Sequence, residues 1–316
     1  MAYVITGATG HIGNNLVKKL LELNQEVRVL VRKIDDSIKD LNVEYCVGDI
    51  FNKEFLYQHI DKDDIVIHLA AIIDIKNKLK DETNKINYEG TLVITNTCIE
   101  KEVKKYIYCS SVDCIYKNNP DELISEPNKI EYDKFTQNYP YSKGKATQYV
   151  LDMIAKHQDL NISIIYPSAV IGVNDWKPSS VGKVVQDCIK GKMQFGIKGG
   201  YNFIDVDDVV MSIINLSFND KKGNYILSGH NITVFELYEM INRELDKKRK
   251  IWKIPMFIVK LAIPFVPYLS KFMLETLQEN YNYDNSLAMK ELKLRLTPFE
   301  KTIKKTIEWF KLQERN

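Results

Sequence analysis

Short apolar runs, rich in β-branched and aromatic residues, alternate with helical patterns through the first 170 residues. The runs that predict strands are residues 2–6, 26–31, 43–47, 64–70, 104–110 and 161–166. The patterns that predict helices lie between most of them, at residues 11–23, 52–60, 83–101 and 140–157. Strands that are apolar throughout are buried on both faces, and helical crossovers join parallel strands. The pattern therefore predicts an α/β fold with a doubly wound parallel sheet.

The pattern after residue 170 predicts a second, smaller unit. A strand-like run at 203–206 leads into an apolar helix, and another short strand follows at 225–229. We assign residues 1–171 and 203–229 to one discontinuous domain. Residues 172–202 and 230–316 are expected to form a mostly helical C-terminal lobe that binds the substrate. The polar segment 116–138 predicts a surface loop near the mouth of the site.

Composition and charge describe an ordinary globular protein. Of 316 residues, 45% are hydrophobic and 27% are charged, and the net charge of +2 gives no electrostatic reason to expect nucleic-acid binding. The chain starts directly on a strand, without a signal-peptide pattern, and we expect a cytoplasmic protein. No metal site is expected, since no ligand spacing is seen. The cysteines predict buried thiols in a reducing compartment, at residues 46, 98, 109, 114 and 188.

An apolar stretch at residues 254–273 contains three prolines and two lysines, which argues against a transmembrane helix. The basic run 247–250 precedes it. Peripheral contact with a membrane is one explanation, and a buried amphipathic helix explains the same pattern. A homodimer is a further open expectation.

A glycine-rich turn, Thr-Gly-Ala-Thr-Gly-His-Ile-Gly, follows the first strand at residues 6–13. Its glycines permit a sharp turn and a close approach to a pyrophosphate, which the following helix N-terminus favours. The position after a strand predicts a Rossmann-type dinucleotide site, although the spacing is G-x-x-G-x-x-G and a plain tight turn is the alternative. The residues expected to contact the cofactor here are Gly7, Thr9, Gly10, His11, Ile12 and Gly13.

The end of the second strand bears on the choice of cofactor. Arg32 stands where an arginine accommodates the 2′-phosphate of NADP(H), so NADP(H) is the expected cofactor. NAD(H) stays open because Asp35 and Asp36 follow closely and could reach the ribose. The alternative for Arg32 is a solvated charge at the end of a strand. After the third strand, Asp49 and Ile50 are expected to contact the adenine. An aspartate that merely begins a helix is the alternative for Asp49.

Two overlapping Tyr-x-x-x-Lys pairs occur on one predicted helix. Tyr139 and Lys143 share a face with apolar residues, whereas Tyr141 and Lys145 fall on the polar face. A tyrosine can pass a proton to a substrate oxygen, and a lysine one turn later stabilises the phenolate. A catalytic pair must point inward, so we assign the chemistry to Tyr139 and Lys143. Pro140 is expected at the first helical position.

Several motifs occur in a fixed order along nearly the whole chain. They are the glycine turn, VIHLAA at 66–71, INYEGT at 86–91, YCSS at 108–111, YPYSK at 139–143, YPSAVIG at 166–172, GGYNFIDVDD at 199–208 and the ending at 291–310. Together they resemble the extended short-chain dehydrogenase/reductase superfamily (the NAD-dependent epimerase/dehydratase family). Within it, they are most similar to the branch of dihydroflavonol-4-reductase-like and 3β-hydroxysteroid dehydrogenase-like proteins.

The resemblance implies roles for individual residues. Tyr139 would be the general acid/base, Lys143 would hold the nicotinamide ribose and lower the pKa of the tyrosine, and Ser111 would bind the substrate oxygen. Ser110 is the alternative to Ser111 as the serine that binds the substrate oxygen. Other expected cofactor contacts are Leu69, Ala70, Ala71, Ser110, Pro167, Ser168 and Val170. Expected substrate contacts are Ile73, Asp113, Trp176 and Tyr201. The alternative for Asp113 is a loop carboxylate without a role in binding. The alternative for the aromatic residues, which include Phe195 and Phe203, is that they form the core of the lobe.

Other polar residues of these motifs are expected to be structural. His68 is expected to be a satisfied core residue, His11 to contact cofactor or solvent, and Asn87 to tie the region of the fourth strand together.

The expected function is NADP(H)-dependent interconversion of a small hydrophobic ketone or aldehyde and its alcohol. The alternative is a nucleotide-sugar epimerase or dehydratase with tightly bound cofactor, and a cofactor-sensing regulator without turnover is a third hypothesis. Tyr166 replaces the arginine usual in sugar-modifying relatives, and only Arg243 occurs between residues 172 and 245. Both features disfavour a sugar nucleotide, whose diphosphate is usually bound by arginines.

Overall fold

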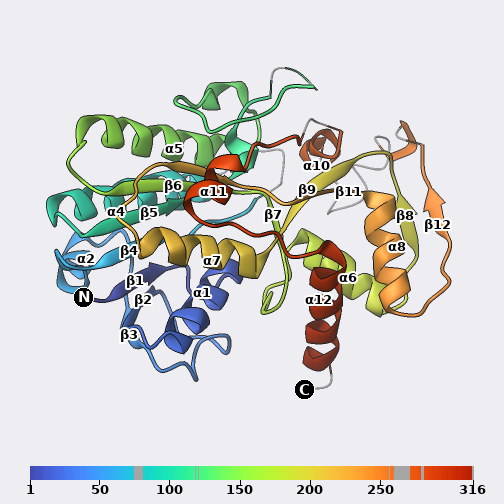
Figure 1. Ribbon diagram of the computed structural model, residues 1–316, viewed down its shortest axis with the longest axis horizontal. Coiled ribbons are helices and arrows are strands. Elements are labelled where there is room, and N and C mark those ends of the chain that lie inside the picture. Colours follow the sequence, from blue (N-terminus) through green and yellow to red (C-terminus); the bar gives the residue numbers. More distant parts are fainter. Residues whose placement is uncertain are drawn as a thin grey trace.

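A seven-stranded parallel sheet forms the centre of the protein in the computed structural model (Figure 1), which describes residues 1–74, 81–117, 119, 121–255, 257–259, 271–278 and 281–314. The strand order is β10-β6-β5-β4-β1-β2-β3, and every neighbouring pair is parallel. The strands are β1 (Tyr3–Thr6), β2 (Val27–Val31), β3 (Glu44–Val47), β4 (Ile65–His68), β5 (Lys105–Cys109), β6 (Ile162–Pro167) and β10 (Asn224–Leu227). The predicted α/β fold is confirmed.

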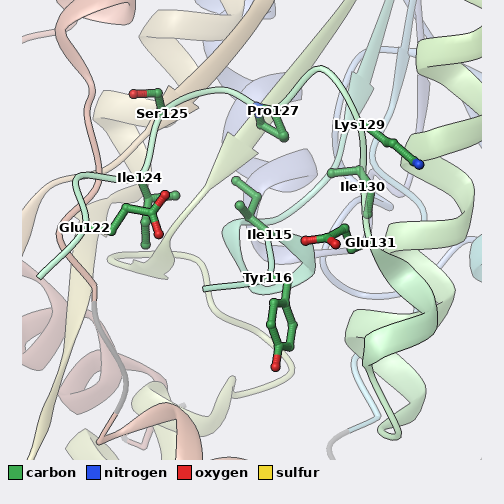
Figure 2. Close-up of a pocket in the computed structure, with 9 residues that line it drawn as sticks. All are labelled: Ile115, Tyr116, Glu122, Ile124, Ser125, Pro127, Lys129, Ile130 and Glu131. Atoms are coloured by element: carbon green, nitrogen blue, oxygen red, sulfur yellow. The ribbon is translucent and has the colours of Figure 1, made fainter. Parts of the chain in front are cut away.

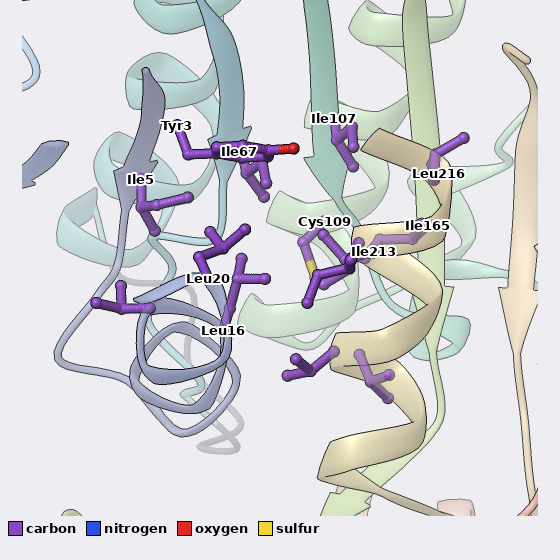
Figure 3. Close-up of a cluster of buried hydrophobic side chains, with 14 of the residues drawn as sticks. Tyr3, Ile5, Leu16, Leu20, Ile67, Ile107, Cys109, Ile165, Ile213 and Leu216 are labelled. Atoms are coloured by element: carbon purple, nitrogen blue, oxygen red, sulfur yellow. The ribbon is translucent and has the colours of Figure 1, made fainter. Parts of the chain in front are cut away.

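Helices cover both faces of the sheet, as its mostly apolar and buried strands require. On one face lie α1 (His11–Glu22), α7 (Val206–Ser217) and α11 (Ser286–Glu291). On the other lie α2 (Lys53–His59), α4 (Gly90–Glu100) and α5 (Asn138–Lys156). Successive strand residues point to opposite faces, so Ile67 packs with the first layer and Val66 with the second. Figure 3 shows Ile213 and Leu216 of α7 against Ile107 and Ile165.

The end of α7 is fixed by a buried lysine at the start of β5. Lys105 Nζ donates hydrogen bonds to the carbonyl oxygens of Leu216 (2.5 Å), Asn219 (2.5 Å) and Lys221 (3.0 Å). A cation at a helix C-terminus satisfies carbonyls that have no partner within the helix. The ammonium group therefore joins the sheet to the layer that covers it.

Two helices differ in detail from the pattern. The segment predicted as one helix at 83–101 consists of α3 (Asp81–Asn84), a π-helical turn η1 (Lys85–Glu89) and α4. Helix α5 begins at Asn138, so the prediction that Pro140 takes the first helical position is wrong. Pro140 is the third residue, where a missing N–H still costs nothing because first-turn N–H groups have no partner within the helix.

Within the described residues, the lobe combines three longer helices and one short helix with two small sheets, and β7, β8, β11 and β12 were not predicted. Its helices are α6 (Ser180–Ile189), α8 (Val234–Glu244) and α12 (Phe299–Gln313), with the short α10 (Lys271–Thr276). One sheet has the order β11 (His230–Thr233), β9 (Gly200–Asp205), β7 (Ala169–Ile171). The other pairs β8 (Gln194–Gly196) with β12 (Ile251–Lys253). The helices close around a core of Val185, Ile241, Ile303 and Phe310.

The sequence-based boundary needs one correction. Ala288, Leu292 and Leu294 were assigned to the lobe, yet they pack in the core that α1 and α7 form beneath the large sheet. A segment this short carries no periodicity that would identify the core against which it packs. Of the range 203–229, α7 and β10 belong to the layers of the large sheet, whereas residues 203–205 lie in β9 of the small three-stranded sheet.

The predicted loop 116–138 contains a short 3-10 turn, η3 (Tyr132–Lys134), and Ile124 forms a bridge with Tyr283. Much of the apolar stretch 254–273, to which the explanation by peripheral membrane contact applied, lies outside the described residues. Among the residues that are described, no helix has the length and apolar character needed to cross a membrane.

Candidate functional site

The glycine turn is packed too closely for side chains. Gly7 has φ +76°, and a Cβ there would lie 2.7 Å from the backbone nitrogen of Ala70. A Cβ on Gly13 would lie 2.2 Å from the carbonyl oxygen of Gly7. Gly10 caps α1 without any side-chain hydrogen bond, so the first N–H groups of the helix keep their capacity for an anion.

Further features around this turn fit a dinucleotide. Leu69 and Ala70 are partly buried and Ala71 is exposed beside the turn, at the end of β4. The hydroxyl of Ser168 is buried and has no hydrogen-bond partner among the described residues. A buried hydroxyl without a partner is unfavourable, so this atom suits a polar group of a ligand. Pro167 ends β6 and Val170 lies partly buried in β7, on either side of that hydroxyl.

The residues after β2 differ in their freedom to contact a cofactor. The Arg32 side chain is exposed and has no ion-pair partner in the described part of the chain. Asp35 is bound by Lys177 at 2.9 Å and Asp36 by Lys39 at 2.9 Å. The two carboxylates that kept NAD(H) open are thus engaged by lysines.

Asp49 and His11 make contacts within the protein. Asp49 Oδ1 accepts a hydrogen bond from Phe51 N at 3.0 Å, and its predicted adenine contact stays a prediction. The cap of α2 is Asn52, so the alternative that Asp49 begins a helix is wrong. His11 Nε2 lies 3.0 Å from the carbonyl oxygen of Val173. Burial lowers the pKa of His11, despite the opposing carboxylate of Asp175, so its ring is neutral. His11 thereby links the glycine turn to the loop after β7. Thr9 and Ile12 lie close to His11 in the chain, and both are half-buried.

Tyr139 and Ser111 lie next to one another. Tyr139 is buried on the inner face of α5, and its phenol interacts with the side chain of Ser111. Ser110 points elsewhere, because its hydroxyl lies 2.6 Å from Thr147 Oγ1 and 3.2 Å from Cys114 Sγ. The two alternatives for the serine are therefore separated by geometry, and Ser111 is the one beside Tyr139. The hydroxyl of Ser110, predicted to contact cofactor, is engaged with α5.

Lys143 is buried one helical turn after Tyr139. Its Nζ donates a hydrogen bond to the carbonyl oxygen of Cys109 at 2.6 Å and lies 4.4 Å from the ring centroid of Tyr108. Burial lowers the pKa of Lys143 to about 8. The same face of α5 buries Ala146 and Val150, which confirms the predicted orientation of this helix.

An aspartate–tyrosine pair adjoins this cluster. Asp113 lies in the 3-10 turn η2 (Val112–Cys114), and Tyr201 of β9 donates a hydrogen bond to its Oδ1. Burial, and then the negative charge of Asp113, raise the pKa of Tyr139 well above its usual value, against the opposing effect of the Ser111 hydrogen bond. The expectation of a lowered pKa for this tyrosine does not hold in the chain alone. Tyr139 is a neutral phenol and can donate a proton.

The other expected substrate contacts are not gathered here. Trp176 packs edge-on against Trp309, with a centroid distance of 5.6 Å, and Lys18 lies 5.7 Å over its ring. Phe203 packs on Phe299 in the lobe core, and Phe195 is exposed on β8. The lobe-core alternative is therefore correct for Phe203. Ile73 is exposed in the segment after β4.

A buried polar network supports the cluster from behind. Asn87 in η1 accepts a hydrogen bond from Ile72 N (2.7 Å) and donates to Ile72 O (2.9 Å) and Ser142 Oγ (3.0 Å). It ties the segment after β4 to α5, as predicted. His68 is bonded through both ring nitrogens, to Thr6 at 2.6 Å and Thr91 at 3.1 Å, and burial lowers its pKa to about 3. His68 is the satisfied core residue that was expected.

Two threonines of the site escaped the sequence analysis. Thr147 holds Ser110, and Thr6 accepts a hydrogen bond from Ala70 N at 3.3 Å. Thr147 lies four residues after Lys143, on the same helical face, and this spacing is the signal that could have identified it.

A small cavity of about 170 Å³ flanks the site (Figure 2). Its lining comes from the end of η2 and from the loop that follows: Ile115, Tyr116, Glu122, Ile124, Ser125, Pro127, Lys129, Ile130 and Glu131. Ligand pockets usually measure about 300–1,000 Å³, so we do not assign the substrate to this cavity alone.

Comparison with known proteins places the chain in a family. The profile of the 3-beta hydroxysteroid dehydrogenase/isomerase family matches residues 4–230. The chain belongs to this family. Its members are extended short-chain dehydrogenases/reductases, so the protein is an NAD(P)-dependent enzyme of the oxidoreductase class, as the motifs implied.

Individual relatives agree with this membership. The chain is 23% identical to "Sterol demethylase protein B" of Methylococcus capsulatus, with 98% of each chain covered. It is 27% identical to a "Putative dihydroflavonol 4-reductase" of Synechocystis, with 98% of this chain and 94% of the relative covered.

Solved structures agree on the fold. A crystal structure titled gox2253 has a TM-score of 0.85 at 27% identity and covers 99% of both chains. The UDP-glucose 4-epimerase of Thermotoga maritima, solved with UDP-glucose, has a TM-score of 0.81 at 20% identity, over 99% of this chain and 100% of the other. At 20% identity, the similarity to the epimerase shows a shared fold alone.

Proposed function

We propose that this family member is an NADP(H)-dependent reductase of hydrophobic ketones or aldehydes, which also oxidises the corresponding alcohols. The observation that carries the proposal is the buried cluster of Ser111, Tyr139 and Lys143, in which the phenol is protonated and lies beside the serine. Carbonyl reduction needs a proton donor at the substrate oxygen, and a neutral phenol is one.

Each residue of the cluster would have a separate task. NADP(H), when bound, supplies the hydride. Tyr139 would give its proton to the carbonyl oxygen, so the product is an alcohol and the side chain is left as a phenolate. Ser111 would donate a hydrogen bond to the same oxygen and orient it. Lys143 would hold the nicotinamide ribose and place its positive charge near the phenolate.

Charge and polarity near Tyr139 support a hydrophobic substrate. The carboxylate of Asp113, held by Tyr201, would repel the diphosphate of a sugar nucleotide. Arg243, the only arginine between residues 172 and 245, is exposed on α8. The names of two relatives, a sterol demethylase protein and a putative dihydroflavonol reductase, indicate flat, largely apolar ligands.

Two measurements test the proposal together. NADPH oxidation is followed with aryl ketones, steroids and sugar nucleotides, and calorimetry on the NADP-loaded protein measures binding of the same compounds. We expect stoichiometric NADPH consumption with at least one hydrophobic ketone. Micromolar binding of UDP- or dTDP-sugars, with no binding among the hydrophobic compounds, would instead establish the epimerase or dehydratase alternative.

Arg32→Ala should weaken NADPH binding by about 10- to 100-fold and change NADH binding little. The basis is that a charge-assisted hydrogen bond to phosphate contributes about 1.5–3 kcal/mol, and NADH has no 2′-phosphate. Fluorescence titration of both cofactors measures the effect, with Lys39→Ala, whose partner is Asp36, as the control. Equal affinities of the unsubstituted protein for NADPH and NADH would contradict the assignment.

Asp113→Asn should move the alkaline limb of the reduction profile to lower pH. Burial raises the pKa of Tyr139 most, and the charge of Asp113 adds to it. Reduction requires the protonated phenol, so its rate falls as pH rises through that pKa. Removing the charge lowers the pKa, and the fall then begins at lower pH. Alcohol oxidation, which needs the phenolate, should gain activity at lower pH.

Tyr201→Phe is the control for this pH experiment, because it removes the hydrogen bond to Asp113 and keeps the charge. Its reduction profile should retain the high alkaline limb. An unchanged limb in Asp113→Asn would show that Asp113 does not act on Tyr139.

A further inference from the structure

Three potential metal ligands converge at the far edge of the sheet from the catalytic cluster. Glu44 and Cys46 lie two residues apart on the edge strand β3, and His59 ends α2. One ligand atom from each residue lies within 4.8 Å of the other two. Strand β3 is separated from β5, which leads to Ser111, by β4, β1 and β2. The group is therefore independent of the reaction described above.

The distances within this group fit a tetrahedral ion. Cys46 Sγ lies 3.2 Å from His59 Nδ1 and 3.7 Å from Glu44 Oε1. Zinc binds thiolate at about 2.3 Å and imidazole or carboxylate at about 2.0–2.2 Å, so two tetrahedral ligand atoms stand about 3.5 Å apart. Both measured separations are within about 0.3 Å of that value. The Glu44 side chain is 55% exposed and can rotate to close the third separation.

Neighbouring residues hold the ligands in place. Arg28 donates from Nε to Glu44 Oε2 at 2.8 Å and from Nη1 to the carbonyl oxygen of His59 at 2.9 Å. The ring of Phe55 meets that of His59 edge-on, with centroids 4.8 Å apart. Contacts outside the ligands commonly orient metal sites in this way. Arg28 occupies Glu44 Oε2, so Oε1, which lies 3.7 Å from Cys46 Sγ, is the carboxylate oxygen that can bind the ion.

The charges also balance for a divalent ion. Arg28 is paired with both Glu44 (2.8 Å) and Asp64 (3.1 Å), so these two carboxylates, a thiolate from Cys46 and the one guanidinium leave two negative charges for the ion. His59 ends α2, where the negative end of the helix dipole favours a cation. Sulfur and nitrogen ligands exclude magnesium and calcium, which prefer oxygen, and favour zinc.

We propose that Glu44, Cys46 and His59 form a Zn²⁺ site that fastens the edge strand β3 to α2, with water as the fourth ligand. Binding forms one bond from the ion to each side chain and releases the Cys46 thiol proton to solvent. The chain spacing of 44, 46 and 59 matches no familiar metal motif, so the cysteine pattern alone predicted no site.

Cobalt titration of the chelator-treated, full-length protein tests the proposal directly. We expect one Co²⁺ per chain, the d–d bands of a tetrahedral ion, and a thiolate-to-cobalt charge-transfer band that Zn²⁺ abolishes. Zn²⁺ should also raise the Tm. Cobalt that binds octahedrally, without the charge-transfer band, would overturn the assignment.

Single substitutions identify the ligands. Cys46→Ser should remove the charge-transfer band and the Zn²⁺-dependent rise in Tm. Glu44→Gln, which alters an exposed side chain, and His59→Gln should each weaken Co²⁺ by about tenfold or more. The matched controls are Cys188→Ser, another buried thiol, and His157→Gln, which should bind as the unsubstituted protein does. If Cys46→Ser does not fold, unchanged affinity in both Glu44→Gln and His59→Gln is sufficient to reject the site.

Discussion

Tyr139→Phe should lower carbonyl reduction by about 10²- to 10⁴-fold, the usual contribution of a positioned proton donor. The substitution removes only the hydroxyl beside Ser111 and leaves the ring in its buried place on α5. NADPH affinity should therefore change by no more than a few-fold. Single-turnover NADPH oxidation measures the chemical step, and fluorescence titration measures cofactor binding.

Tyr141→Phe is the matched control, since it removes the same atom two residues away. The Tyr141 ring is partly exposed and packs edge-on against Tyr132, with centroids 5.9 Å apart. Removal of the Tyr141 hydroxyl should leave turnover nearly unchanged. If Tyr141→Phe were inactive and Tyr139→Phe active, the assignment of the catalytic face of α5 would be wrong.

Gly13→Ala should disrupt the cofactor site and the fold around it. The new Cβ would lie 2.2 Å from Gly7 O and 2.8 Å from Gly7 C, and neither backbone atom can rotate away. Overpacking of this kind costs about 3 kcal/mol or more when backbone must shift. NADPH affinity should fall by about 100-fold or more, because the phosphate-facing turn and the start of α1 are displaced together.

Gly10→Ala serves as the comparison for Gly13→Ala. A Cβ at Gly10 meets one atom, Gly7 O at 3.2 Å, which a small local shift relieves. Thermal unfolding and NADPH titration of both variants should show a large loss for Gly13→Ala and a small one for Gly10→Ala. A Gly13→Ala protein with native Tm and cofactor affinity would be incompatible with the packing of this turn.

The sequence predicted the parts of the fold that local patterns determine. Five of the first six strands are mostly apolar and buried along nearly their whole length, because burial on both faces requires such a run, whereas the edge strand β3 is half exposed. All six appear within two residues of their predicted places. The orientation of α5 followed from periodicity, since Tyr139 and Lys143 share a face with Ala146 and Val150. These features depend on residues close together in the chain.

Contacts between distant residues could not be predicted in the same way. Asp113 and Tyr201 meet across 88 positions, and nothing in either neighbourhood indicates the pairing. Trp176 lies between the predicted catalytic elements but packs on Trp309 of α12, because a tryptophan in a loop carries no periodicity that fixes its direction. The short strands of the lobe are likewise below the length at which alternation is informative.

The late position of α7 in the chain has a consequence for synthesis on the ribosome. When β1 to β6 have all emerged, the sheet face at Ile107 and Ile165 still lacks α7, which supplies Ile213 and Leu216 (Figure 3). Lys105 likewise lacks all three of its carbonyl partners until residue 221 is made. A nascent chain that ends near residue 171 thus carries an exposed apolar face, the property that recruits chaperones and favours aggregation, while water solvates the Lys105 ammonium group. The apolar face of the sheet is covered only when α7 has been made, and α7 follows residues 172–202 of the lobe in the chain.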